Sequence, residues 1–93
     1  MKSKKETRIT QVRLLINSIP EGRKSNFKRL VQYELAETYN IVMSESQLHT
    51  FIQSGYSSVA EEIIQAITTV VEKMIQEEMD YKTKIQEIQF QAA

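Results

Sequence analysis

The chain has no cysteine and no tryptophan, and it has only one proline, two glycines and one histidine in 93 residues. Without cysteine it forms no disulfide or thiolate metal site, which suits a reducing cytoplasm. So few turn-forming residues disfavour a sheet-rich fold. Apolar runs are only a few residues long, too short for a membrane span or a signal-peptide core. We therefore expect a cytoplasmic helical protein with no membrane partner.

The charge is divided by position along the chain. Residues 1–30 carry nine basic and two acidic side chains, a net charge of +7, whereas residues 31–93 carry three basic and ten acidic ones, a net charge of −7. The overall net charge of zero conceals this asymmetry. A basic segment followed by an acidic helix predicts contact with a polyanion at one end and with protein at the other.

The pattern of apolar residues predicts an all-α fold with three short helices and a long C-terminal helix. We divide the chain into a flexible basic tail (1–7), a small helical domain (8–56) and a long amphipathic, coiled-coil-like helix (57–93). The spacing of Ile9, Val12, Ile16 and Ile19 favours a first helix. Alternation across residues 8–16 leaves a short strand as the alternative, which would pair with a second subunit as a DNA-binding β-ribbon.

Local signals predict where the second and third helices begin and end. Ser25 is a suitable N-cap for the second helix, and Asn40 is a plausible left-handed terminator. Ser44 and Gln47 have the spacing of a capping box at the start of the third helix, and Gly55 lies where a C′ residue belongs. The inward face of the second helix is predicted to contain Phe27, Leu30, Val31 and Leu35.

A second capping box, Ser58 with Glu61, predicts the start of a helix that continues to about residue 91. Such a helix is about 50 Å long, whereas a compact globule of this chain length is only about 32 Å across. It must therefore bend or project. Its apolar stripe is wide over 59–75, which suits a core helix, and narrows over 78–92, which suits a two-helix seam.

Heptad spacing along this helix predicts self-association as a homodimer. Glu78 interrupts the heptads, and two facing glutamates would disfavour parallel pairing. In the alternative interpretation, the first half is a core helix and the second half is a solvated tail. The residues predicted to form the seam between copies are Ile64, Ile67, Val71, Met74, Tyr81, Ile85 and Ile88.

No pattern of residues indicates catalysis. A lone histidine without HxxxH, ExxH or CxxC spacing predicts no metal site. The phosphate-binding loop, the dinucleotide-binding glycine motif and the GxSxG nucleophile motif are all missing from the sequence. We therefore expect a protein that is not an enzyme and that has no cofactor and no small-molecule substrate.

Cations near the start of the chain are the candidates for nucleic-acid contact, because cations at a helix N-terminus suit phosphate binding. The alternative is an ordinary solubilising surface. The candidates are Arg8, Arg13, Arg23, Lys24, Lys28 and Arg29.

Residues 35–52 resemble a helix-turn-helix in part, through Ala36, Asn40, Leu48 and Ile52, although the turn is about two residues too long. The resemblance implies that the third helix reads bases through Gln47, His49, Thr50 and Gln53. This helix has no Arg or Lys and includes Glu45. The N-terminal segment is therefore the better candidate for the DNA-facing surface.

Two functions follow from these patterns. The first is a small dimeric nucleic-acid-binding protein, such as a transcription regulator or accessory factor of a phage or plasmid, that binds double-stranded DNA. The second is a protein–protein interaction module, acting as an inhibitor, adaptor or assembly subunit, that docks a protein partner through its long helix.

Overall fold

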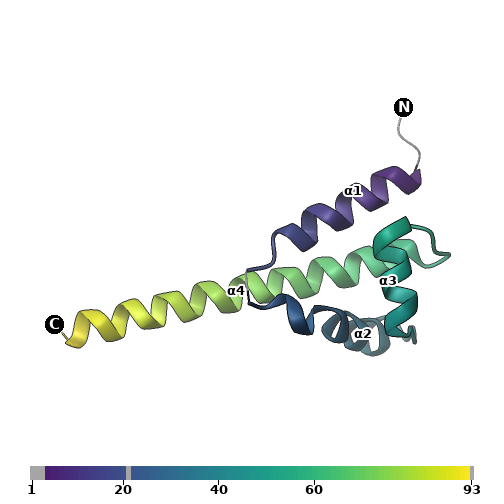
Figure 1. Ribbon diagram of the computed structural model, residues 1–93. Helices are drawn as coiled ribbons and strands as arrows, with labels where there is room; N and C mark the ends of the chain where they lie inside the picture. Colours follow the sequence, from purple (N-terminus) through teal and green to yellow (C-terminus); the bar gives the residue numbers. More distant parts are fainter. Residues whose placement is uncertain (1–3, 21, 93) are drawn as a thin grey trace.

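The computed structural model describes residues 4–20 and 22–92. They form α1 (Lys4–Asn17), a short 3₁₀ turn η1 (Lys24–Asn26), α2 (Phe27–Thr38), α3 (Glu45–Ser54) and α4 (Ala60–Ala92), as Figure 1 shows. The predicted all-α fold, with shorter helices before a long C-terminal one, is confirmed. No strand occurs in this described part of the chain.

The N-terminal segment is helical throughout its described length. Residues 8–16 lie inside α1, so the strand alternative, and with it a β-ribbon, is wrong. Within this helix the Thr10 hydroxyl donates to the Glu6 carbonyl at 2.9 Å. Residues 4–7 of the predicted tail form the first turn of α1, and residues 1–3 lie outside the described residues.

The α3 helix has the two ends that its sequence predicts. The Gln47 amide donates to Ser44 Oγ at 3.1 Å, and the Ser44 amide donates to Gln47 Oε1 at 2.9 Å, which completes the capping box. Gly55 ends the helix with a left-handed φ of 67°, which glycine adopts without the steric cost of a Cβ. This helix buries Leu48 and Phe51 against the core.

The ends of α2 agree only partly with prediction. Asn40 takes the expected left-handed conformation, with φ 57°, just beyond the helix. The start differs from prediction, because η1 occupies residues 24–26 and α2 begins only at Phe27. The N-cap of α2 is Asn26, and its side chain makes no capping hydrogen bond. Ser25 lies within η1 and therefore does not cap α2.

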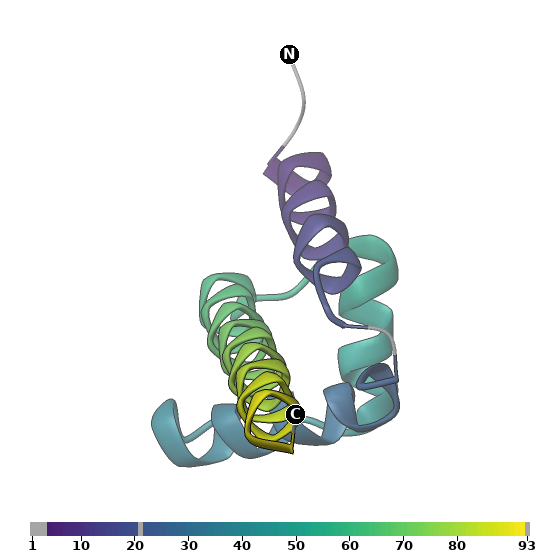
Figure 2. The same cartoon turned by 90° about the vertical axis from the view of Figure 1, so that its left-hand side faces the viewer.

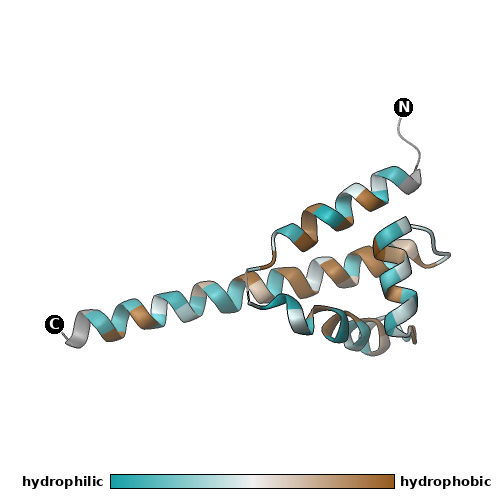
Figure 3. Ribbon diagram, in the orientation of Figure 1, coloured by the Kyte–Doolittle hydropathy of each residue, from teal (hydrophilic) through white to brown (hydrophobic). Residues whose placement is uncertain are grey.

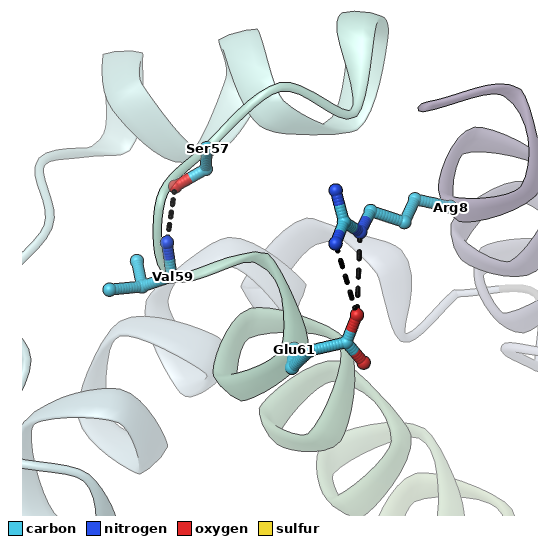
Figure 4. Close-up of polar contacts among 4 residues, drawn as sticks. All are labelled: Arg8, Ser57, Val59 and Glu61. Atoms are coloured by element: carbon cyan, nitrogen blue, oxygen red, sulfur yellow. Dashed lines mark hydrogen bonds and ion pairs between the residues drawn. The ribbon is translucent and has the colours of Figure 1, made fainter. Parts of the chain in front are cut away.

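The start of α4 also differs from prediction. The Val59 amide donates to Ser57 Oγ at 3.2 Å, and the Glu61 carboxylate accepts from Arg8 rather than folding back on its own helix (Figure 4). The hydroxyl at the start of α4 is therefore supplied by Ser57, one residue before the predicted Ser58. The sequence alone does not indicate that Glu61 has a partner 53 positions away.

The core lies between the first half of α4 and the three shorter helices. Viewed along α4, the helices α1, α3 and α2 surround one side of it (Figure 2). The core contains no polar or charged side chain among the described residues. Its completely buried large side chains are Val12, Val31, Leu35, Leu48, Phe51, Ile63, Ile67 and Val71.

The second half of α4 extends beyond this core. We call residues 78–92 the arm, and we call the rest of the described chain the body. The molecule measures 54 × 32 × 18 Å, and its radius of gyration is 15.9 Å, against about 12 Å for a compact chain of this length. Of the two predicted outcomes, the long helix projects (Figure 1).

Candidate interaction surfaces

One face of α4 is covered in the body and uncovered in the arm. Residues seven apart share a helix face, so Ile67, Met74, Tyr81 and Ile88 lie in one row. Ile67 is completely buried and Met74 is 4% exposed, but Tyr81 is 58% and Ile88 is 59% exposed. Figure 3 shows apolar bands that continue from the body into the arm. Within the described residues, the arm therefore carries an apolar stripe that is exposed at Tyr81 and Ile88.

The residues predicted to form the seam divide accordingly into two groups. Ile64, Ile67, Val71 and Met74 are buried in the core of a single chain, where α1 and α2 pack against α4. Three side chains remain for contact between copies. Tyr81 and Ile88 are exposed and Ile85 is half-buried, and we call these three the arm stripe.

Arg23 marks the boundary between body and arm. Its Nε lies 2.9 Å from Glu78 Oε2, and its Nη1 lies 3.1 Å from Glu77 Oε2. The side chains of Arg23 and Glu78 are only 31% and 27% exposed. The charge that interrupts the heptads therefore has a partner, and this partner comes from the loop between α1 and α2.

An open groove lies where α2 meets α4, beside the base of the arm. It has a volume of about 190 Å³. Leu30 and Tyr33 form one wall and are 40% and 59% exposed. Leu30 was predicted to lie inward, and this prediction is wrong because α2 presents it to the groove instead. The residues that line the groove are Leu30, Tyr33, Glu34, Glu37, Val70, Lys73, Met74 and Glu77.

Two of the predicted nucleic-acid contacts are engaged in ion pairs with α4. Arg8 Nη2 lies 3.3 Å from Glu61 Oε1, as Figure 4 shows, and Arg23 is held by Glu77 and Glu78. The sequence does not predict these pairs, because each joins residues more than 50 positions apart. The structure thus places both arginines against carboxylates of the acidic half of the chain.

The other four predicted contacts form no ion pair within the described residues. Lys28 Nζ is 3.2 Å from His49 Nδ1 of α3. Arg13, Lys24 and Arg29 are exposed, and none of the ion pairs within the described residues involves them. Lys24, Lys28 and Arg29 lie together in η1 and the first turn of α2. We call these three the basic cluster.

The candidate base-reading residues of α3 are all exposed. Gln47 has its side-chain oxygen in the capping box, and the Thr50 hydroxyl donates to the Ser46 carbonyl at 3.0 Å. His49 faces Lys28. Of the four, Gln53 alone has a side chain that makes no hydrogen bond or ion pair within the described residues. In this conformation the side chains of Gln47 and Thr50 therefore form hydrogen bonds within α3 and its N-terminal cap.

No group of three or more His, Asp or Glu side chains in the described part of the chain is arranged to hold a metal ion. No described helix combines the length and the hydropathy that crossing a bilayer requires.

Comparison of the chain with protein-family models, with curated proteins and with solved structures finds no match in any of the three.

Proposed function

We propose that this chain is a non-enzymatic protein-interaction module that forms a homodimer through its arm. The supporting observation is the change along one face of α4, which is buried at Met74 and uncovered at Tyr81 and Ile88. Complete burial of a side chain of this size stabilises by about 1.5–3 kcal/mol. In a single chain Tyr81 and Ile88 stay exposed and do not contribute this stabilisation. Contact between two arms would bury them.

The length of the arm also supports a partner. Isolated helices shorter than about 12–15 residues are marginal in water, because most helix stability in proteins comes from packing of an apolar face. Residues 78–92 are close to that limit, and beyond their base they extend past the other described helices (Figure 1). Pairing supplies the missing packing. A chain without cysteine suits the reducing cytoplasm, and this is where we propose that the protein acts.

Mass measured by light scattering over a concentration series tests this proposal. We expect the mass to rise from the 10.8 kDa of one chain to twice that value. The double substitution Tyr81→Asp with Ile88→Asp should keep the protein monomeric. Gln86→Asp is the matched control, because Gln86 is exposed on the opposite side of the arm and should leave the dimer intact. A wild-type mass that stays at one chain would exclude a second copy as the partner.

Nucleic-acid binding is the second function that we propose, for a small regulator or accessory factor acting on double-stranded DNA. The observation that favours it is the basic cluster of Lys24, Lys28 and Arg29, which is not neutralised by carboxylates of the described residues. A dimer would carry two such clusters. Fluorescence anisotropy with duplex DNA at about 50 mM salt tests it, since phosphate contacts are strongest at low salt. Absence of binding by the folded dimer would exclude this second function.

A further inference from the structure

The groove between α2 and α4 lies next to the arm stripe on the surface of α4. Val70 and Met74 belong to both the core and the groove, and Met74 precedes Tyr81 by one heptad. Leu30 and Tyr33 add two exposed apolar side chains from α2. A helix that lies along the arm stripe therefore reaches this groove without leaving the same face of α4.

We propose that the arm of a second copy occupies this groove in a reciprocal, antiparallel dimer. The inference rests on the self-association proposed above and adds its orientation and its docking site. Each copy then contributes the arm stripe and the two groove residues Leu30 and Tyr33, so the apolar contact extends beyond the three side chains of the arm.

Charge complementarity supports a second copy as the occupant. The groove is lined by three carboxylates, Glu34, Glu37 and Glu77, and by one cation, Lys73. The arm carries Lys82 and Lys84 beside Glu78, Asp80 and Glu87, a net charge of −1, so any attraction to the groove comes from these two lysines individually. Glu34 already pairs with Lys73 at 3.8 Å and Glu77 with Arg23 at 3.1 Å, so the attraction that the two lysines gain at this exposed site is modest. The chain thus contains both the groove and an apolar helix whose two lysines can face the carboxylates of the groove.

A single antiparallel register brings these groups together. With Tyr81 near the two-fold axis, Ile88 of one copy lies across from Met74 of the other, at the groove. Lys84 then lies across from Glu77 and Glu78. In a parallel pair Glu78 would instead face its own counterpart, and like charges opposite each other are destabilising. The antiparallel register is therefore the one that suits both the apolar residues and the charges.

Cysteine cross-linking tests the orientation, because the chain has no cysteine of its own. In the proposed register the two copies of residue 81 are adjacent, whereas the two copies of residue 88 are about 21 Å apart along the helices, at 1.5 Å per residue. A disulfide requires Cα atoms within about 7 Å. We expect Tyr81→Cys to form a covalent dimer under mild oxidation and Ile88→Cys to remain uncross-linked.

Substitution in the groove tests the docking site. Leu30→Asp places a charge on the groove wall, and we expect it to raise the dimer dissociation constant at least about tenfold, or 1.4 kcal/mol. Leu14→Asp is the matched control, since Leu14 is 64% exposed on α1 and lies outside the groove. It should leave the dissociation constant within about threefold of the wild-type value, or 0.7 kcal/mol. Circular dichroism verifies that both variants remain folded.

The outcomes separate this inference from the function on which it rests. Equal cross-linking of both cysteine variants would overturn the antiparallel register and leave self-association standing, as would a wild-type dimer in which Tyr81→Cys does not cross-link. If Leu30→Asp weakens the dimer no more than Leu14→Asp does, the groove is not the docking site. A wild-type chain that stays monomeric at every concentration would overturn both proposals.

Discussion

Arg23 Nε lies 2.9 Å from Glu78 Oε2, although the two residues are 55 positions apart in the chain. The contact ties the loop that follows Pro20 to the first residue of the arm, and a second ion pair to Glu77 adds to it at 3.1 Å. The guanidinium thus bridges adjacent carboxylates that would otherwise repel each other. It also joins the loop between α1 and α2 to α4 at the point beyond which α4 extends past the other helices.

We predict that Arg23→Ala lowers the free energy of unfolding by about 1 kcal/mol, because half-buried Glu78 loses its partner. Urea denaturation followed by circular dichroism measures the change. Arg29→Ala is the control, since Arg29 is exposed and takes part in no ion pair of the described residues. High salt should reduce the effect at Arg23 by screening. Equal losses for the two variants would show that the ion pairs contribute nothing.

The row of residues along α4 predicts contrasting effects of two similar substitutions. Ile67→Ala removes a completely buried side chain and should destabilise the monomer by about 2–5 kcal/mol. Ile88→Ala, at a position 59% exposed, should change monomer stability by less than about 0.5 kcal/mol. Both are measured by urea denaturation at a protein concentration too low for association. A large loss for Ile88→Ala in the monomer would mean that the arm belongs to the folded core.

The capping box of α3 supplies a local test. Ser44→Ala removes the oxygen that accepts from the Gln47 amide and should lower the free energy of unfolding by about 1 kcal/mol. Ser46→Ala, two residues later on the exposed side of α3, should have an effect close to zero. Thermal unfolding of both variants checks the difference. Similar midpoints for the two would contradict a stabilising role for the cap.

Charge-matched variants test the proposed DNA contact. Changing Lys24, Lys28 and Arg29 together to Gln removes the basic cluster and should abolish most of the binding to duplex DNA seen in anisotropy. The control changes the exposed Gln65, Thr83 and Gln86 to Glu, which lowers the net charge by the same three units in the acidic half of the chain, outside the arm stripe and the groove. Arg23 is left unchanged, because its ion pairs stabilise the body. Equal binding by the two variants would exclude the basic cluster as the DNA-contacting site.

Many features that depend on neighbouring residues were predictable from the sequence, although the capping signals at Ser25 and at Ser58 with Glu61 were not realised. The Ser44–Gln47 capping box, the left-handed Asn40 and the Gly55 helix end all involve groups within a few positions of each other. The narrowing of the apolar stripe also coincides with the structure, since Met74 is buried and Tyr81 is exposed. Such signals are readable because backbone geometry alone decides which residues meet.

Features that depend on how helices pack against each other were not predictable. The spacing of Leu30 suits the inward face of α2, but the way this helix meets α4 leaves it 40% exposed at a groove. The partners of Arg8 and Arg23 come from the far end of the chain, and no periodicity connects them. Glu78 offered a hint, because a charge among heptad positions indicates a need for a counterion.

The unbroken course of α4 has a thermodynamic consequence. The same 33-residue helix supplies the centre of the core and the free arm, with no glycine or proline between them to act as a hinge. Any ligand that holds the arm only in its helical form also favours the folded state as a whole, by an amount set by its concentration relative to its dissociation constant. Binding of any such ligand to the arm should therefore raise the melting temperature of the whole protein.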